Sequence, residues 1–159
     1  MKVLLLFTGG TISMVRDAET GALHPADMQT FKAFVPELFA GDIQVDMIPF
    51  EPLLDSSDLN PDNWRQMAHV VQDNYDAYDG FVILHGTDTM AYSASALSFM
   101  FDNLCKPVVF TGSQLPVGVL RSDAKENLLT AIEIAAAYDT DGKAIVPEVT
   151  LFMDGELYR

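Results

Sequence analysis

The chain is poor in the residues that hold metal clusters or bind polyanions. Its only cysteine is Cys105, so it can form neither an internal disulfide bond nor a thiolate metal cluster. Lysine and arginine number 9 against 23 aspartate and glutamate residues, which gives a net charge of −14. A surface this negative repels nucleic acids and anionic lipids, so we expect neither nucleic acid nor a membrane as a partner.

Long apolar runs are also lacking. The first apolar run, residues 3–7, is too short for a signal-peptide core or a membrane span. Together with the single cysteine, this predicts a cytoplasmic enzyme or binding domain. The 159 residues are 49% apolar and 20% charged, a composition typical of one globular domain with a full core.

Short apolar runs alternate with helical patterns along the whole chain. Strands are expected at residues 3–7, 43–48, 81–84, 108–110 and 149–153, and helices at 28–39, 61–75, 90–101 and 123–137. Strict alternation predicts an α/β fold, a doubly wound, mostly parallel sheet with flavodoxin-like strand order. The second strand should end at Pro49. Residues 14–25 are polar and turn-rich, and we expect an exposed, mobile segment that could act as a lid over Thr11.

The most informative stretch is residues 81–90, FVILHGTDTM. A buried strand stops at Gly86, and Thr87 and Asp88 follow directly before a helical pattern. In open parallel sheets, ligands bind at the carboxyl ends of the strands. The alternative is that Asp88 is only a helix N-cap and Thr87 only a turn residue.

Hydroxyl groups follow three other strands. Thr11 comes after a pair of glycines, Ser56 and Ser57 follow the second strand, and Ser113 follows the fourth. Adjacent serines are often simple turn formers. However, the carboxyl ends of parallel strands share one edge, so we expect these residues to converge there with Thr87 and Asp88. The glycine pair matches neither a dinucleotide fingerprint nor a P-loop, so no nucleotide cofactor is implied.

Such a set of groups suits a small zwitterion. A carboxylate such as Asp88 can hold an ammonium group, while serine hydroxyls and backbone N–H groups hold a carboxylate. A threonine hydroxyl can be an acyl-transfer nucleophile if a base activates it. The three histidines, His24, His69 and His85, lack metal-ligand spacing, and we expect surface or supporting roles for them and no metal.

Four motifs together carry a family resemblance: TGGTI at residues 8–12, DSSD at 55–58, HGTDTM at 85–90 and TGSQ at 111–114. In this order they resemble the bacterial L-asparaginases, most closely the type I, cytoplasmic branch. The resemblance implies hydrolysis of L-asparagine to L-aspartate and ammonia through an acyl-threonine intermediate, without a cofactor. It also implies a homodimer or homotetramer.

The resemblance assigns roles residue by residue. Thr11 resembles the primary nucleophile, and Thr87 and Asp88 resemble the second hydroxyl and its carboxylate. Asp88 would also hold the substrate ammonium group.

The remaining motif positions resemble substrate-binding groups. Ser56 and Ser57, with Asp55, resemble the clamp for the substrate α-carboxylate. Ser113 resembles the residue whose backbone faces the side-chain amide.

Two departures from the family pattern matter. Residues 15–25 contain no tyrosine, which the family often places near the nucleophile. The family's catalytic lysine follows the last strand of its first domain, whereas this sequence ends at Arg159; Lys106 precedes a strand and should lie at the wrong edge. We therefore expect residues 1–159 to be an N-terminal asparaginase domain without the smaller C-terminal domain, and to be nearly inactive alone.

Two other functions remain open. One is a non-catalytic amino-acid-binding domain. The other is the asparaginase-like subunit of a transfer-RNA-dependent amidotransferase, which the net charge of −14 disfavours.

Overall fold

Apolar strands alternate with helices along the chain in a computed structural model that describes residues 1–17 and 20–159. The strands are β1 (Lys2–Gly9), β2 (Met14–Arg16), β3 (Leu23–Pro25), β4 (Gln44–Leu54), β5 (Gly80–Leu84), β6 (Val108–Thr111), β7 (Val149–Met153) and β8 (Glu156–Tyr158). The α-helices are α1 (Met28–Phe34), α2 (Pro61–Asp73), α3 (Met90–Met100) and α4 (Ala124–Ala135). Short 3-10 helices are η1 (Thr11–Ser13), η2 (Pro36–Phe39), η3 (Ser56–Asp58) and η4 (Tyr75–Ala77).

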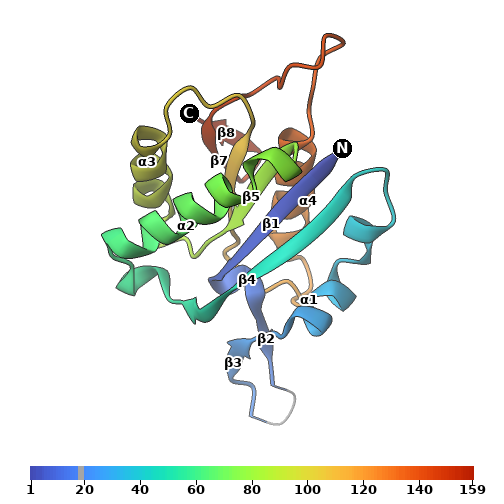
Figure 1. The fold of residues 1–159 in the computed structure, drawn as a ribbon. Helices are drawn as coiled ribbons and strands as arrows, with labels where there is room; N and C mark the ends of the chain where they lie inside the picture. Colours follow the sequence, from blue (N-terminus) through green and yellow to red (C-terminus); the bar gives the residue numbers. More distant parts are fainter. Residues whose placement is uncertain (18–19) are drawn as a thin grey trace.

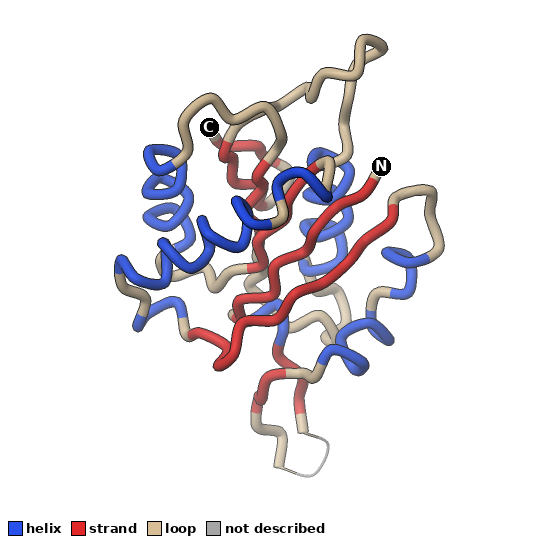
Figure 2. Tube along the Cα trace, in the orientation of Figure 1, coloured by secondary structure: helices blue, strands red, loops and turns tan. Residues whose placement is uncertain are grey.

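The main sheet has the strand order β4-β1-β5-β6-β7-β8 (Figures 1 and 2). The first five strands in this order run parallel, and β8 returns antiparallel to β7. The second long strand of the chain, β4, therefore lies outside the first, and the later strands add on the other side. This is the flavodoxin-like order, and the predicted α/β fold is confirmed.

Helices cover both faces of the sheet because its central strands are apolar on both faces (Figure 1). In β1, Val3, Leu5 and Phe7 pack in one core cluster together with residues of α1 and α4. Leu4 and Leu6 point the other way and pack with residues of α2 and α3. The period of two along the strand thus divides its side chains between two cores, and each fully buried side chain contributes about 1.5–3 kcal/mol.

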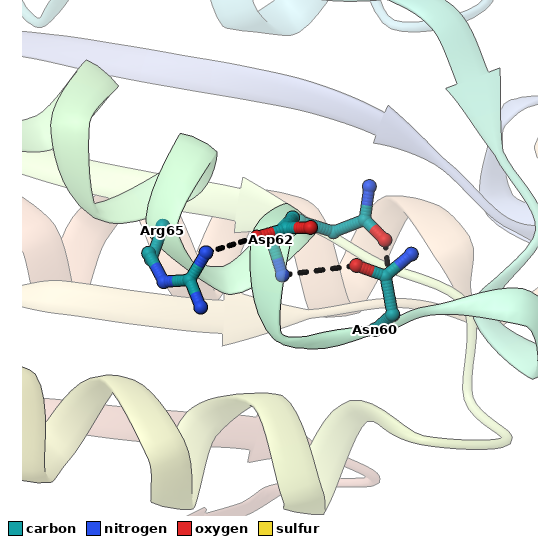
Figure 3. A network of polar contacts seen from close by, with 4 residues as sticks. Asn60, Asp62 and Arg65 are labelled. Atoms are coloured by element: carbon teal, nitrogen blue, oxygen red, sulfur yellow. Dashed lines mark hydrogen bonds and ion pairs between the residues drawn. The ribbon is translucent and has the colours of Figure 1, made fainter.

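Helix α2 begins where the sequence predicts, after Asn60 (Figure 3). The side chain of Asn60 accepts a hydrogen bond from the backbone N–H of Asp62 at 2.9 Å, and its own N–H donates to Asn63 Oδ1 at 2.9 Å. These bonds satisfy N–H groups that have no partner within the helix. Asp62 also forms an ion pair with Arg65, one turn along. The helix ends at Asp73, two residues before the predicted end.

The predicted end of the second strand at Pro49 is wrong, because β4 continues to Leu54. It is the edge strand of the sheet and pairs with β1 alone. An edge strand tolerates proline, since the missing N–H can face the unpaired side. The extra residues carry the chain to the end of β1, where Leu54 pairs with Gly9, and deliver Asp55 and Ser56 to the carboxyl edge.

The prediction of a turn-rich loop over residues 14–25 is wrong at both of its ends. Met14–Arg16 and Leu23–Pro25 pair antiparallel as β2 and β3, below the sheet in Figure 1. Val15 is buried and packs in the core cluster of α1 and α4, whereas β3 is exposed. Residues 18–19, which also belong to the predicted lid, lie outside the described residues. The lid function stays a prediction.

In the described part of the chain, no helix is both long enough and apolar enough to cross a membrane.

Candidate active site

Three loops meet at the carboxyl edge through glycine backbone. A Cβ added to Gly10, after β1, would lie 2.5 Å from the backbone nitrogen of Gly86, after β5. A Cβ added to Gly86 would lie 2.7 Å from Cβ of Ser56, after β4. Gly10 also has φ of +84°, a conformation that favours glycine. Only glycine at positions 10 and 86 lets these loops pack this closely, and this packing brings Thr11, Ser56 and Thr87 to one place.

A cavity of about 350 Å³ opens at this junction. It is lined by Gly9, Gly10, Thr11, Ser13, Met14, Pro25, Leu53, Leu54, Asp55, Ser56, Gly86, Thr87 and Asp88. Five of the seven site residues that the sequence singles out are in this set: Thr11, Asp55, Ser56, Thr87 and Asp88. The volume is suitable for a small ligand such as an amino acid.

The groups assigned to catalysis are free to meet a ligand. Within the described residues, the side chains of Thr11, Thr87 and Asp88 have no hydrogen-bonding or ionic partner. Asp88 is not the N-cap of α3; that position is held by Thr89, whose hydroxyl donates to the backbone carbonyl of Ser56 at 2.7 Å. The alternative explanation of Asp88 as a structural cap is therefore wrong, and Thr89 instead ties the β5 loop to the β4 loop.

The residues after β4 form a tight turn around one carboxylate. Asp55 Oδ1 accepts hydrogen bonds from the backbone N–H of Ser57 at 2.9 Å and from its hydroxyl at 2.8 Å. These two bonds lower the pKa of Asp55, the backbone bond being the larger cause. Ser56 is buried against the loops, whereas Ser57 is exposed and is not among the residues that line the cavity.

Ser113 is not among the residues that line the cavity. It is buried, and its hydroxyl donates to the backbone carbonyl of Leu115 at 2.6 Å. Its neighbour Gly112 packs against the β5 loop, because a Cβ added there would lie 2.5 Å from His85 O and 3.5 Å from Thr87 Cγ2. The β6 loop is therefore in contact with the site, but the Ser113 side chain does not line the cavity.

His85 is buried, which excludes the surface role that was one of the two expected for it and leaves the supporting role. Its ring lies edge-on to Phe110, and its Nδ1 lies 2.7 Å from the carbonyl oxygen of Gly86, to which it donates. Burial lowers its pKa below the ordinary 6.5, and the bond to Gly86 opposes this shift in part. The imidazole is therefore neutral near pH 7.

Besides its glycines, the cavity is lined by five residues that the sequence does not single out as site residues: Ser13, Met14, Pro25, Leu53 and Leu54. Met14 and Pro25 come from the β2–β3 hairpin, and Leu53 and Leu54 come from the end of β4. From the sequence we expect residues 14–25 near Thr11, but a polar, turn-rich pattern does not indicate which of these side chains face the cavity. Leu53 and Leu54 lie beyond the predicted end of the second strand. No group of three His, Cys, Asp or Glu side chains within residues 1–17 and 20–159 could hold a metal ion.

Comparison with known proteins gives one consistent family. The family description "Asparaginase, N-terminal" matches residues 2–159. L-asparaginase 1 of Escherichia coli is 47% identical over 158 residues, which cover 99% of this chain and 45% of that protein. A glutamyl-tRNA(Gln) amidotransferase polypeptide from Thermococcus kodakarensis is 40% identical, over 97% of this chain and 33% of that protein.

The solved structures agree. The crystal structure of L-asparaginase I from Vibrio cholerae matches with a TM-score of 0.87 and 46% identity, over 99% of this chain and 46% of that one. The 159 residues thus span about half the length of the asparaginases that they match. On the fold, the four motifs and these matches, the chain belongs to the asparaginase family.

Proposed function

We propose that the protein hydrolyses L-asparagine to L-aspartate and ammonia, with the substrate bound in the cavity at the carboxyl edge. The observation that carries this proposal is the presence of Thr11, Thr87 and Asp88 in one cavity of amino-acid size, without partners for their side chains among the described residues. These groups supply a hydroxyl nucleophile, a second hydroxyl and a carboxylate for the substrate ammonium group, which an acyl transfer on a zwitterionic substrate requires in addition to a base.

In this proposal, Thr11 Oγ attacks the side-chain amide carbon of asparagine and loses its proton to a base. The carbon–nitrogen bond breaks, the departing nitrogen takes up a proton, and ammonia leaves an acyl ester on Thr11. Water, oriented by the Thr87 hydroxyl, then hydrolyses the ester, which releases aspartate and restores the Thr11 hydroxyl. Asp88 binds the substrate ammonium group, and Ser56, which lines the cavity, binds its α-carboxylate, while Asp55 fixes the turn through its two bonds with Ser57.

No lysine is among the described residues that line the cavity. Lys106 lies at the amino edge of the sheet, as predicted, and donates to the backbone carbonyl of Tyr78 at 2.7 Å. The proposal therefore assigns the base to a lysine in the remainder of a longer protein. Residues 1–159 would be its N-terminal domain, and alone would be nearly inactive, because removal of one member of a catalytic unit removes most of its rate.

The proposal includes the setting of the enzyme. We place it in the cytoplasm as a homodimer or homotetramer, supported by the single cysteine and by the resemblance to type I asparaginases. A role as the asparaginase-like subunit of an amidotransferase is the second candidate, since the amidotransferase polypeptide of T. kodakarensis is 40% identical. That candidate requires transfer RNA, which the charge of −14 disfavours.

The test compares the whole gene product that contains residues 1–159 with its Thr11→Val variant. Release of ammonia and aspartate from asparagine should fall about 10³-fold or more, because valine has the shape of threonine without the nucleophile. The unfolding midpoint should barely change. Equal rates would contradict the role of Thr11, and no hydrolysis by the unaltered protein unless a charged transfer RNA is present would favour the amidotransferase.

A further inference from the structure

A buried amide on α4 joins the β6 loop to the rest of the site. Asn127 is 2% exposed, although it lies on the apolar face of the helix beside Leu128 and Ala131. Its Nδ2 donates to the backbone carbonyl of Gly112 at 3.0 Å and to Asp123 Oδ2 at 3.2 Å. A buried amide is costly unless its hydrogen bonds are made, and here they are directed at the loop after β6.

The acceptor side of the same amide reaches the next loop. Asn127 Oδ1 accepts from the backbone N–H of Asp154 at 3.3 Å, in the turn between β7 and β8. Its Nδ2 also lies 3.4 Å from Met153 Sδ. One side chain therefore contacts the ends of two neighbouring parallel strands, β6 and β7.

Asp123 holds the other end of the β6 loop. Its two carboxylate oxygens accept from the backbone N–H groups of Gln114 at 2.9 Å and of Leu115 at 3.1 Å. Asp123 is the N-cap residue of α4 by position, but its side chain accepts no hydrogen bond from the backbone N–H groups of the first turn of that helix and binds the loop instead. Asn127 and Asp123, one helical turn apart, thus bind the backbone of residues 112–115 at three points.

The loop held in this way is in contact with Thr87. Gly112 packs against the Thr87 methyl group: a Cβ added to Gly112 would lie 3.5 Å from Thr87 Cγ2. Thr87 also lines a second hollow of about 400 Å³, whose wall includes Gln114 and Asp154. Both of these wall residues have their backbone N–H bound by Asp123 or Asn127.

We propose that Asn127 and Asp123 are positioning residues of the active site, which fix the 112–115 loop against Thr87 so that the Thr87 hydroxyl stays in its reactive orientation. This inference rests on the proposed asparagine hydrolysis. The pair acts through the loop and does not touch the substrate. Displacement of a reacting group by about 1 Å can lower a rate by about 10²-fold, which sets the size of effect to expect.

The experiment uses the whole gene product and its Asn127→Ala, Asp123→Ala and Asp123→Asn variants. For Asn127→Ala and Asp123→Ala, kcat for asparagine hydrolysis should fall about 10- to 100-fold while KM changes less than about threefold. Hydrogen exchange at the amides of Gln114 and Leu115 should become faster. Asp123→Asn keeps one acceptor oxygen, and should recover part of the lost kcat and of the exchange protection.

Asn74→Ala is the matched control. Asn74 Nδ2 makes a single bond to the backbone carbonyl of Val70 at 2.8 Å, at the end of α2 that is remote from the cavity. This variant should lose stability and keep kcat. The inference is overturned if the Asn127 and Asp123 variants also lose only stability and keep wild-type kcat.

The two proposals can fail separately. If the unaltered protein does not hydrolyse asparagine, the proposed function is wrong, and exchange at Gln114 and Leu115 still decides whether Asn127 and Asp123 hold the 112–115 loop. Unchanged exchange in Asn127→Ala and Asp123→Ala would overturn the inference whatever the reaction is.

Discussion

Both edges of the sheet carry polar side chains, but they differ in whether those side chains have hydrogen-bonding or ionic partners. At the amino edge, the Lys2 ammonium lies 3.0 Å from Asp46, which also accepts from the Tyr78 hydroxyl at 3.1 Å. The backbone N–H of Lys2 donates to Asp79 at 2.6 Å, and Lys106 donates to the carbonyl of Tyr78. The bond with Lys2 lowers the pKa of Asp46, and the same bond raises that of Lys2.

At the carboxyl edge the corresponding groups are unpaired. Thr11, Thr87 and Asp88 face a cavity, and the described residues provide no partners for their side chains. The polar groups named at the amino edge pair with one another, whereas the side chains of Thr11, Thr87 and Asp88 at the carboxyl edge have no partner among the described residues. The comparison predicts that substitutions at the carboxyl edge cost activity and substitutions at the amino edge cost stability.

The largest expected contrast is between two aspartates. In the whole gene product, Asp88→Asn should lower kcat/KM for asparagine about 10²- to 10³-fold, because a charge-assisted bond to the substrate ammonium group is lost. Its free energy of unfolding should stay within about 0.5 kcal/mol, since Asp88 has no ionic partner to lose among the described residues. Steady-state kinetics and urea unfolding measure the two quantities.

Asp46→Asn is the matched variant at the amino edge. It should keep kcat/KM and lose up to about 1 kcal/mol of stability, the usual range for an exposed ion pair. A large loss of activity in Asp46→Asn, or none in Asp88→Asn, would break the contrast between the edges.

The next largest effect is a loss of stability on substitution of Lys106 at the amino edge. Lys106→Met keeps the apolar stem and removes the ammonium group that donates to the carbonyls of Tyr75 and Tyr78. The free energy of unfolding should fall by about 2 kcal/mol, the usual contribution of hydrogen bonds to charged groups. At temperatures where the variant is folded, kcat should be unchanged. Lys143→Met, in an exposed turn, is the control and should have little effect on either quantity. Loss of kcat in folded Lys106→Met would place that lysine in the reaction after all.

The smallest effect concerns pH. Burial keeps the pKa of His85 below 6.5 in the folded protein, so below about pH 6.5 the unfolded chain binds a proton that the folded chain does not. This contribution to stability is complete above pH 6.5 and is lost as pH falls toward the folded-state pKa. Urea unfolding between pH 7.5 and 5 should therefore show a shallower decline for His85→Gln than for the unaltered protein. The exposed His69→Gln is the control, and parallel curves for all three proteins would contradict the prediction.

The sequence predicted the fold well where apolar runs were short and sharply bounded. Residues 81–84 and 149–153 read as strands because β-prone apolar residues stop at polar or turn residues, and both are strands in the structure. Asn60 and Pro61 marked the start of α2 through local capping chemistry. Such signals are carried by neighbours in the chain, so they can be interpreted without tertiary contacts.

The sequence failed where a distant partner decided the local structure. Residues 49–54 contain two prolines and are expected to leave the sheet, yet they extend β4, because pairing with β1 at an open edge tolerates proline. A second failure has a near partner: residues 14–16 and 23–25 pair with each other as β2 and β3, which their polar, turn-rich sequence does not indicate. For the site, the motifs predicted seven residues, of which Ser57 and Ser113 do not line the cavity.

The sequence by itself determined the alternation of strands and helices, the excess of negative charge and the choice of candidate site residues, since these depend on composition and on local pattern. Only the tertiary structure decided that the loops meet at Gly10 and Gly86, that His85 is buried and that Asn127 reaches the β6 loop. Those features depend on contacts between segments far apart in the chain, whose distances are set by the packing of the sheet and its helices and not by neighbours along the chain.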